Sequence, residues 1–167
     1  LQGLLTLDAR PAARLRVLHS AVGQGDVDVL VDGLRVAKSL PFGWTADYSY
    51  LEVGAHTVQV VPAGAAAPVL LEANLDLASG ADRTLATLGQ AGALTAWTLA
   101  DDNTPPAAGR SRVRLVHAAP GAPAVSVAIE GGATLFNSVG YGAASGYLLA
   151  AAGKYTLVVR NAASGQT

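Results

Sequence analysis

The side chains with the most versatile chemistry in this chain are its three histidines, His19, His56 and His117. The chain has no cysteine, which excludes disulfides, thiolate metal sites and a cysteine nucleophile. Neutral imidazole is a good copper ligand, so the histidines are candidate copper ligands, and His19 and His56 could meet in the fold. The alternative is that His19 and His117, which recur in matching local sequences, hydrogen-bond the turn that follows a strand. We expect this structural role.

A second candidate metal site is the run Asp101, Asp102 and Asn103, just before Thr104-Pro105-Pro106. Carboxylate and amide oxygens are the ligands that calcium prefers. Calcium takes six or more oxygens, however, and the sequence shows no second cluster. We therefore favour a polar hinge with Asx turns over a calcium site.

Nothing in the sequence predicts a serine nucleophile or a pair of acid–base carboxylates. No serine lies in the G-x-S-x-G context of a nucleophile elbow. Asp26, Asp28 and Asp32 occupy alternate positions, which is typical of the solvated face of a half-buried strand. The sequence therefore favours a non-enzymatic protein.

The aromatic side chains that could bind a ligand are Phe42, Trp44, Tyr48, Tyr141 and Tyr147. An exposed Phe-Gly-Trp loop could stack on a sugar ring, a carotenoid or a partner protein. The default expectation is that these rings close the open end of a β-sandwich.

The elements that position these residues have a hydrophobic period of two, which indicates strands. Val27, Val29 and Val31 alternate with residues expected to face outward, and the Asp32-Gly33 pair that follows predicts a hairpin turn. Seven more strands are predicted in the same part of the chain, at residues 14–19, 34–40, 46–51, 56–61, 69–77, 83–88 and 94–99. This density of short strands predicts an all-β fold built from antiparallel, immunoglobulin-like Greek-key sandwiches.

The chain contains a long internal repeat. Arg16–Ala21 matches Arg114–Ala119 at an offset of 98 residues, and after one inserted residue Tyr48 matches Tyr147 at an offset of 99. We therefore predict two tandem sandwiches, with these boundaries: an N-terminal strand or linker at 1–13, a first repeat at 14–100, a linker at 101–110 and a second repeat at 111–167.

The second repeat lacks counterparts of the last strands of the first repeat. The material that follows Gly64 in the first repeat would fall after Thr167 in the second. Either the polypeptide continues, which we expect, or another chain adds the missing strands by β-augmentation. Leu1–Asp8 resembles the end of the first repeat, so it is predicted to be the last strand of a preceding copy or a lone strand.

Charge divides the chain at the same place. Residues 1–109 carry 6 basic and 11 acidic side chains, whereas residues 110–167 carry 5 basic side chains and only Glu130. This pattern argues against a nucleic-acid-binding protein and favours attraction between the halves or between neighbouring copies. No apolar run reaches the roughly 18 residues of a membrane span.

Three runs in the second repeat carry a family resemblance: Arg114–Val127 (RLVHAAPGAPAVSV), Gly140–Tyr147 (GYGAASGY) and Ala152–Val159 (AGKYTLVV). They resemble the bacterial domain-of-unknown-function 4397 (DUF4397) family, whose pattern is close to RVxHASPxAPxVDV, a glycine-containing segment that ends in tyrosine, and AGxYxV. The first repeat departs from this pattern at Val22, Gly25 and His56.

The resemblance implies a secreted or cell-envelope β-sandwich, often in tandem, with no established activity. We therefore expect a non-enzymatic structural or binding module at the surface, in the periplasm or outside a bacterium, as an accessory part of an assembly resembling a surface layer. Its expected partners are a larger envelope protein or further copies of itself. The alternative function is a copper-dependent redox enzyme resembling superoxide dismutase, although the chain has no H-x-H pair.

Overall fold

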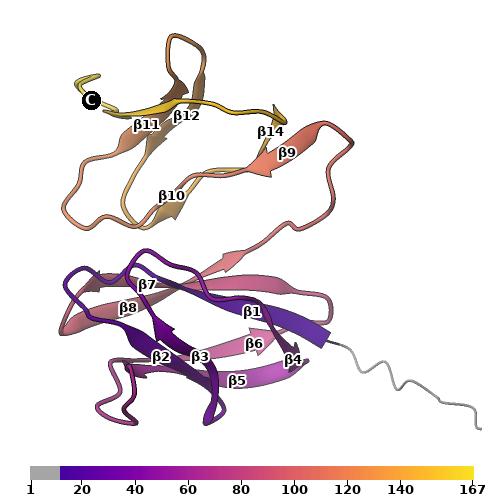
Figure 1. Ribbon diagram of the computed structural model, residues 1–167, viewed down its shortest axis with the longest axis vertical. Helices are drawn as coiled ribbons and strands as arrows, with labels where there is room; N and C mark the ends of the chain where they lie inside the picture. The colour runs from indigo at the N-terminus through magenta and orange to yellow at the C-terminus, as the bar shows by residue number, and fades with distance from the viewer. Residues whose placement is uncertain (1–11) are drawn as a thin grey trace, which may run out of the picture.

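The computed structural model describes residues 12–167, which fold entirely into strands, turns and loops (Figure 1). Every strand pair lies either within β1–β8 or within β9–β15, so pairing follows the two sequence repeats. Residues 12–167 contain no helix long and apolar enough to cross a membrane. The predicted N-terminal strand at Leu1–Asp8 lies outside the described residues.

The first repeat is a sandwich of two four-stranded sheets. One sheet has the order β4 (Ser49–Glu52), β1 (Ala12–His19), β7 (Asp82–Gln90) and β8 (Ala93–Ala100). The other has the order β3 (Leu34–Leu40), β2 (Val27–Val31), β5 (Gly54–Pro62) and β6 (Leu71–Leu77). All eight predicted strands are present, and the all-β prediction is confirmed.

One pairing differs from the predicted antiparallel arrangement. β1 runs parallel to β7, with Arg14 opposite Asp82 and Arg16 opposite Thr84. Alternation within single strands carries no information about the direction of their neighbours, so the sequence did not reveal this pair. The parallel register matters because it places two arginines of β1 beside polar side chains of β7.

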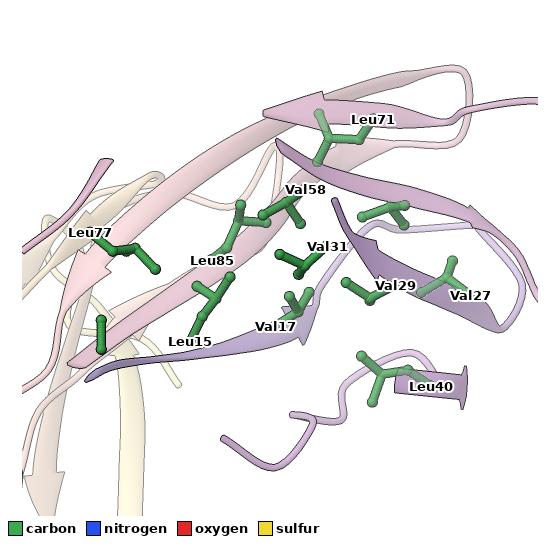
Figure 2. Packing of buried hydrophobic residues seen from close by; sticks show 12 residues of the cluster. Leu15, Val17, Val27, Val29, Val31, Leu40, Val58, Leu71, Leu77 and Leu85 are labelled. Atoms are coloured by element: carbon green, nitrogen blue, oxygen red, sulfur yellow. The ribbon is translucent and has the colours of Figure 1, made fainter. Parts of the chain in front are cut away.

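The core of the first repeat lies between the two sheets (Figure 2). Val27, Val29 and Val31 face inward from β2, as their alternation predicts, and meet Leu15 and Leu85 from the opposite sheet. The cluster contains twelve buried apolar residues. Because burial of each such side chain contributes about 1.5–3 kcal/mol, this cluster is the main source of stability in the first repeat.

Asp28 does not lie on a solvated face, so that prediction is wrong. Its side chain is fully buried, and its carboxylate accepts hydrogen bonds from the backbone N–H of Ser39 at 2.7 Å and of Gly64 at 3.0 Å. The reason is a β-bulge opposite Asp28, in which Ser39 adopts a positive φ of 49°. These bonds hold the pKa of Asp28 below its ordinary value, the one from Ser39 most strongly.

The second repeat reproduces strands β1–β5 of the first, with the counterpart of β1 divided into two short strands and one additional short strand, β13 (Ala143–Ala144). Its strands are β9 (Arg110–Val113), β10 (Val116–His117), β11 (Val125–Ile129), β12 (Thr134–Val139), β13 (Ala143–Ala144), β14 (Leu148–Ala151) and β15 (Leu157–Asn161). β9 pairs with β14 and β11 with β15, as β1 pairs with β4 and β2 with β5. The bulge also recurs, because Ser138 has a φ of 50° and donates its N–H to Ser126 Oγ.

The apolar cluster of the second repeat is much smaller. Its buried members are Val127, Phe136 and Val139. Among the described residues, no strand of this repeat corresponds to β6, β7 or β8. Leu157 and Val159 are about half exposed, whereas their counterparts Val58 and Val60 in the first repeat are buried.

Asp28→Ala is expected to lower the free energy of unfolding by roughly 2–4 kcal/mol, because it leaves two backbone N–H groups without an acceptor. Ser126→Ala, at the equivalent position, is expected to cost less, since Ser126 accepts only one such bond and is not fully buried. Urea denaturation of both variants measures the difference. The lowered pKa of Asp28 adds a second expectation: its contribution is full above about pH 4 and declines as the pH falls further. Equal losses in the two variants would contradict the assignment.

Candidate functional site

His19 and His117 occupy equivalent places at the ends of β1 and β10. Nε2 of His19 lies 3.1 Å from the carbonyl oxygen of Gly25, and Nε2 of His117 lies 3.0 Å from that of Pro123. In each case Nε2 donates to the loop that follows the strand, which leaves Nδ1 as the acceptor of the neutral tautomer. Both imidazoles are buried. The geometry is that of the predicted structural role.

The expectation that His19 and His56 could meet is wrong. His19 contacts Gly25, which precedes β2, whereas His56 contacts Asp32, which follows β2. The two histidines therefore lie near opposite ends of this strand. Nδ1 of His56 is 2.6 Å from Asp32 Oδ2, and its Nε2 is 2.9 Å from the carbonyl oxygen of Glu52.

Both partners of His56 are acceptors, so the imidazolium, which has two N–H donors, satisfies them best. The hydrogen bond to Asp32 raises the pKa of His56, and the bond to the Glu52 carbonyl acts in the same direction. The same contact lowers the pKa of Asp32, assisted by the backbone N–H of Thr57. This pair joins the β2–β3 hairpin turn to the beginning of β5.

Within residues 12–167, no group of three or more His, Asp or Glu side chains is arranged to hold a metal ion. The linker residues proposed for calcium face protein donors instead. Asp101 accepts from Arg114, Asp102 accepts from Arg112, and the amide nitrogen of Asn103 donates to Asp82 at 2.7 Å. No contact of these side chains favours a cation, and the copper and calcium sites stay predictions.

Asp101 is the centre of the junction between the repeats. Its carboxylate is fully buried and accepts hydrogen bonds from the Tyr48 hydroxyl, from Thr84 Oγ1 at 2.6 Å and from Arg114. Arg16 lies 3.6 Å away and also donates to Thr84. One carboxylate at the end of β8 thus binds side chains of β1, β7 and the second repeat. Burial raises the pKa of the Tyr48 phenol, and the bond to Asp101 raises it further.

Arginine–tyrosine stacking occurs in both repeats at this junction. The guanidinium of Arg16 lies 4.6 Å from the centre of the Tyr48 ring, and that of Arg114 lies 4.9 Å from the centre of the Tyr147 ring. The Tyr147 hydroxyl also accepts the backbone N–H of Asp102 at 3.2 Å. Tyr48 and Tyr147, predicted as ligand-binding aromatics, are therefore engaged in holding the repeats together.

The loop between β3 and β4 presents two more of the predicted aromatics, Phe42 and Trp44. Phe42 is 54% exposed and Trp44 is 66% exposed. The loop backbone is nevertheless well fixed: His19 N donates to the carbonyl of Trp44 at 2.9 Å, and Gly43 N donates to the carbonyl of His19 at 2.7 Å. Gly43 has a φ of 80°, a conformation that favours glycine. Phe42 packs edge-on against His19, with ring centres 6.0 Å apart. We call residues 41–45 the aromatic loop.

The equivalent loop of the second repeat has a different environment. Tyr141 packs edge-on against His117, as Phe42 packs against His19. The neighbouring Gly142 lies against the first repeat, since a Cβ at this position would be 3.9 Å from Leu88 Cδ1. Leu88 is almost fully buried although it lies near the end of β7. Gly142 therefore lies beside the first repeat, although Tyr141 is 42% exposed, whereas residues 41–45 of the aromatic loop are all exposed.

The sequence did not single out the basic side of the junction. Arg110, Arg112 and Arg114 occupy alternate positions, and this R-x-R-x-R spacing places them on one side of an extended chain. This spacing is the sequence feature from which a basic surface could have been predicted. The role of Asp82, which pairs with Arg14, depends on the parallel β1–β7 register and left no local signal. The hydrogen bond from Arg14 holds the pKa of Asp82 below its ordinary value.

Asp101→Asn is expected to lower the free energy of unfolding by roughly 2–4 kcal/mol, because it leaves the guanidinium of Arg114 near a buried neutral group. It is also expected to speed protease cleavage within residues 102–109, since the junction would open more often. Asp76→Asn, on the exposed side of β6, is the matched control. Unchanged cleavage in Asp101→Asn would show that this carboxylate does not hold the repeats together.

The His56–Asp32 pair predicts a pH dependence. Because the folded pKa of His56 is raised, its stabilising effect is full below the unfolded pKa of about 6.5 and is lost as the pH rises through the folded value. The melting temperature of His56→Gln should therefore fall furthest below wild type at pH 5.5 and approach it at pH 8.5. Thermal denaturation across this range measures the effect. A difference that does not change with pH would argue against a charged His56.

A family model described as a domain of unknown function, DUF4397, matches residues 13–128. The match begins in β1 and ends in β11, so it includes the first repeat, the linker and the beginning of the second repeat. No curated protein matched the chain in sequence. Because the matched region is more than half of the 167 residues, the chain belongs to the DUF4397 family.

Proposed function

We propose that this protein is a non-enzymatic module of the bacterial cell envelope or exterior, and that it takes part in a surface assembly by binding a protein through its aromatic loop. The observation that carries the proposal is the exposure of Phe42 and Trp44 on a backbone fixed by hydrogen bonds. Large aromatic side chains on a rigid support lose little conformational entropy on binding, and they are enriched among residues that dominate binding energy.

The second repeat supports a protein partner over a sugar or a carotenoid. Its equivalent loop, which contains Gly142, lies against Leu88 of the first repeat. The same structural position thus lies beside an apolar side chain of the protein in the second repeat. A larger envelope protein or a further copy of this chain would offer such a surface to the aromatic loop.

The proposed non-enzymatic role also agrees with how the polar residues are used. His19 and His117 bond to loop carbonyls, and the linker carboxylates bond to arginines. The copper redox alternative gains no support from this arrangement, because it divides the histidines among separate places. Export, an envelope location and the partner itself are parts of the proposal.

Trp44→Ala is expected to weaken retention of the native envelope partner on immobilised protein by about tenfold or more, as for a buried aromatic at an interface centre. Tyr155→Ala, which removes another half-exposed aromatic side chain, is the matched control and should retain the partner. Quantitative mass spectrometry of the retained fraction measures the effect, and Trp44 fluorescence should shift to shorter wavelength on binding. Undiminished retention in the Phe42→Ala/Trp44→Ala double variant would refute a role for the aromatic loop.

A further inference from the structure

A basic cleft lies at the junction of the repeats, apart from the aromatic loop. It is a shallow, open cleft of about 560 Å³, lined by Arg16 of β1, by linker residues 102–104 and 106, by residues 110–114 and by Tyr147. Four of the lining residues are arginines: Arg16, Arg110, Arg112 and Arg114. Arginine presents a planar fork of N–H donors that matches the two oxygens of a carboxylate.

The negative charges of the carboxylates at the junction are fewer than the positive charges of its arginines. Five guanidinium groups meet there, from Arg14, Arg16, Arg110, Arg112 and Arg114, and the ion pairs with them are made by three carboxylates, those of Asp82, Asp101 and Asp102. Asp101 is shared by two of the arginines. Arg110 is exposed, and its guanidinium makes no ion pair with residues 12–167. The cleft therefore carries a net positive charge.

The first repeat shows what these positions bind when they are fully paired. Arg14 is the counterpart of Arg112, and it grips Asp82 with two nitrogens, Nε at 2.7 Å and a terminal nitrogen. Arg112 donates to Asp102 through one terminal nitrogen, and its buried Nε has no partner among the described residues. Arg112 thus contacts a carboxylate through one nitrogen where Arg14 uses two, and the exposed 26% of its side chain is the part that a ligand in the cleft could reach. Arg110 adds a third guanidinium, because its counterpart in the first repeat is Ala12.

We propose that this cleft binds a ligand that carries two or more carboxylate groups. One carboxylate would be held by Arg112 and the other by Arg110, whose side chains lie two residues apart along β9 and hence about 7 Å apart. Asn103 and Thr104 are polar residues of the lining, which suits a hydroxylated ligand. A small polycarboxylate and a uronic acid polymer share this chemistry.

The test is isothermal titration calorimetry of the whole protein with citrate and with polygalacturonate at low ionic strength. We expect one citrate site per chain, weakened about tenfold by Arg110→Gln and weakened by added salt. Arg110→Gln should not disturb folding, since this side chain makes no ion pair in the junction. Arg160→Gln removes a charge from an exposed position on β15 and should leave the affinity within about twofold of wild type.

A second measurement reports on Arg112 directly. Citrate should shift the side-chain Nε–H resonances of Arg110 and Arg112 in a ¹H–¹⁵N spectrum, because a bound carboxylate changes the electrostatic environment of both guanidinium groups. Tighter binding of polygalacturonate than of citrate would assign the site to a polymer, and the reverse would assign it to a small anion. No binding of either probe, or equal losses in Arg110→Gln and Arg160→Gln, would overturn the proposal. Trp44→Ala should leave citrate binding unchanged, so the aromatic loop and the cleft are tested separately.

Discussion

The arrangement of the two repeats depends on one buried carboxylate. Asp101 directly follows β8 and accepts hydrogen bonds from Tyr48 and Thr84 of the first repeat and from Arg114 of the second. It therefore joins one sheet of the first repeat to the beginning of the second repeat. A buried ion pair often adds little net stability, because desolvation of the charges offsets their attraction. Its geometry is nevertheless demanding, since any displacement would leave a charge buried without a partner. Asp101 therefore fixes the orientation of the repeats more than it stabilises either one.

The junction around Asp101 is polar near the linker and apolar toward the end of β7. Near the linker, the arginine–tyrosine stacks keep the guanidinium groups partly solvated and the rings covered. Toward the end of β7, Ala86 and Leu88 are buried, and Gly142 of the second repeat lies near Leu88. The opposite net charges of the two halves of the sequence thus correspond to ion pairs at the junction. Basic side chains at the start of the second repeat bind the acidic end of the first.

The sequence predicted the strands well because each is short, alternating and bounded by turn residues. Val27, Val29 and Val31 are the clearest case, since their alternation and the following Asp32-Gly33 turn identify both the strand and its buried face. The same alternation failed for Asp28. A bulge in β3 and the turn at Gly64 cover this position, and neither is visible in the pattern of β2 itself. Similarly, the parallel β1–β7 pair and the separation of His19 from His56 follow from the order of strands in space, which a local period does not encode.

Repeats within one chain provide an internal comparison that a single sandwich lacks. Gly142 and Gly43 both have a positive φ, yet Gly142 lies beside Leu88 of the first repeat whereas no such neighbour is found at Gly43. Likewise, Arg14 is fully paired whereas its counterpart Arg112 is not. A position whose contacts are made within the protein in one repeat but not in the other is a candidate contact site for an external partner. By that reasoning the aromatic loop is the proposed contact site for an apolar protein surface, and the junction cleft is the proposed binding site for carboxylate oxygens. The two proposed contacts therefore differ in chemistry as well as in place.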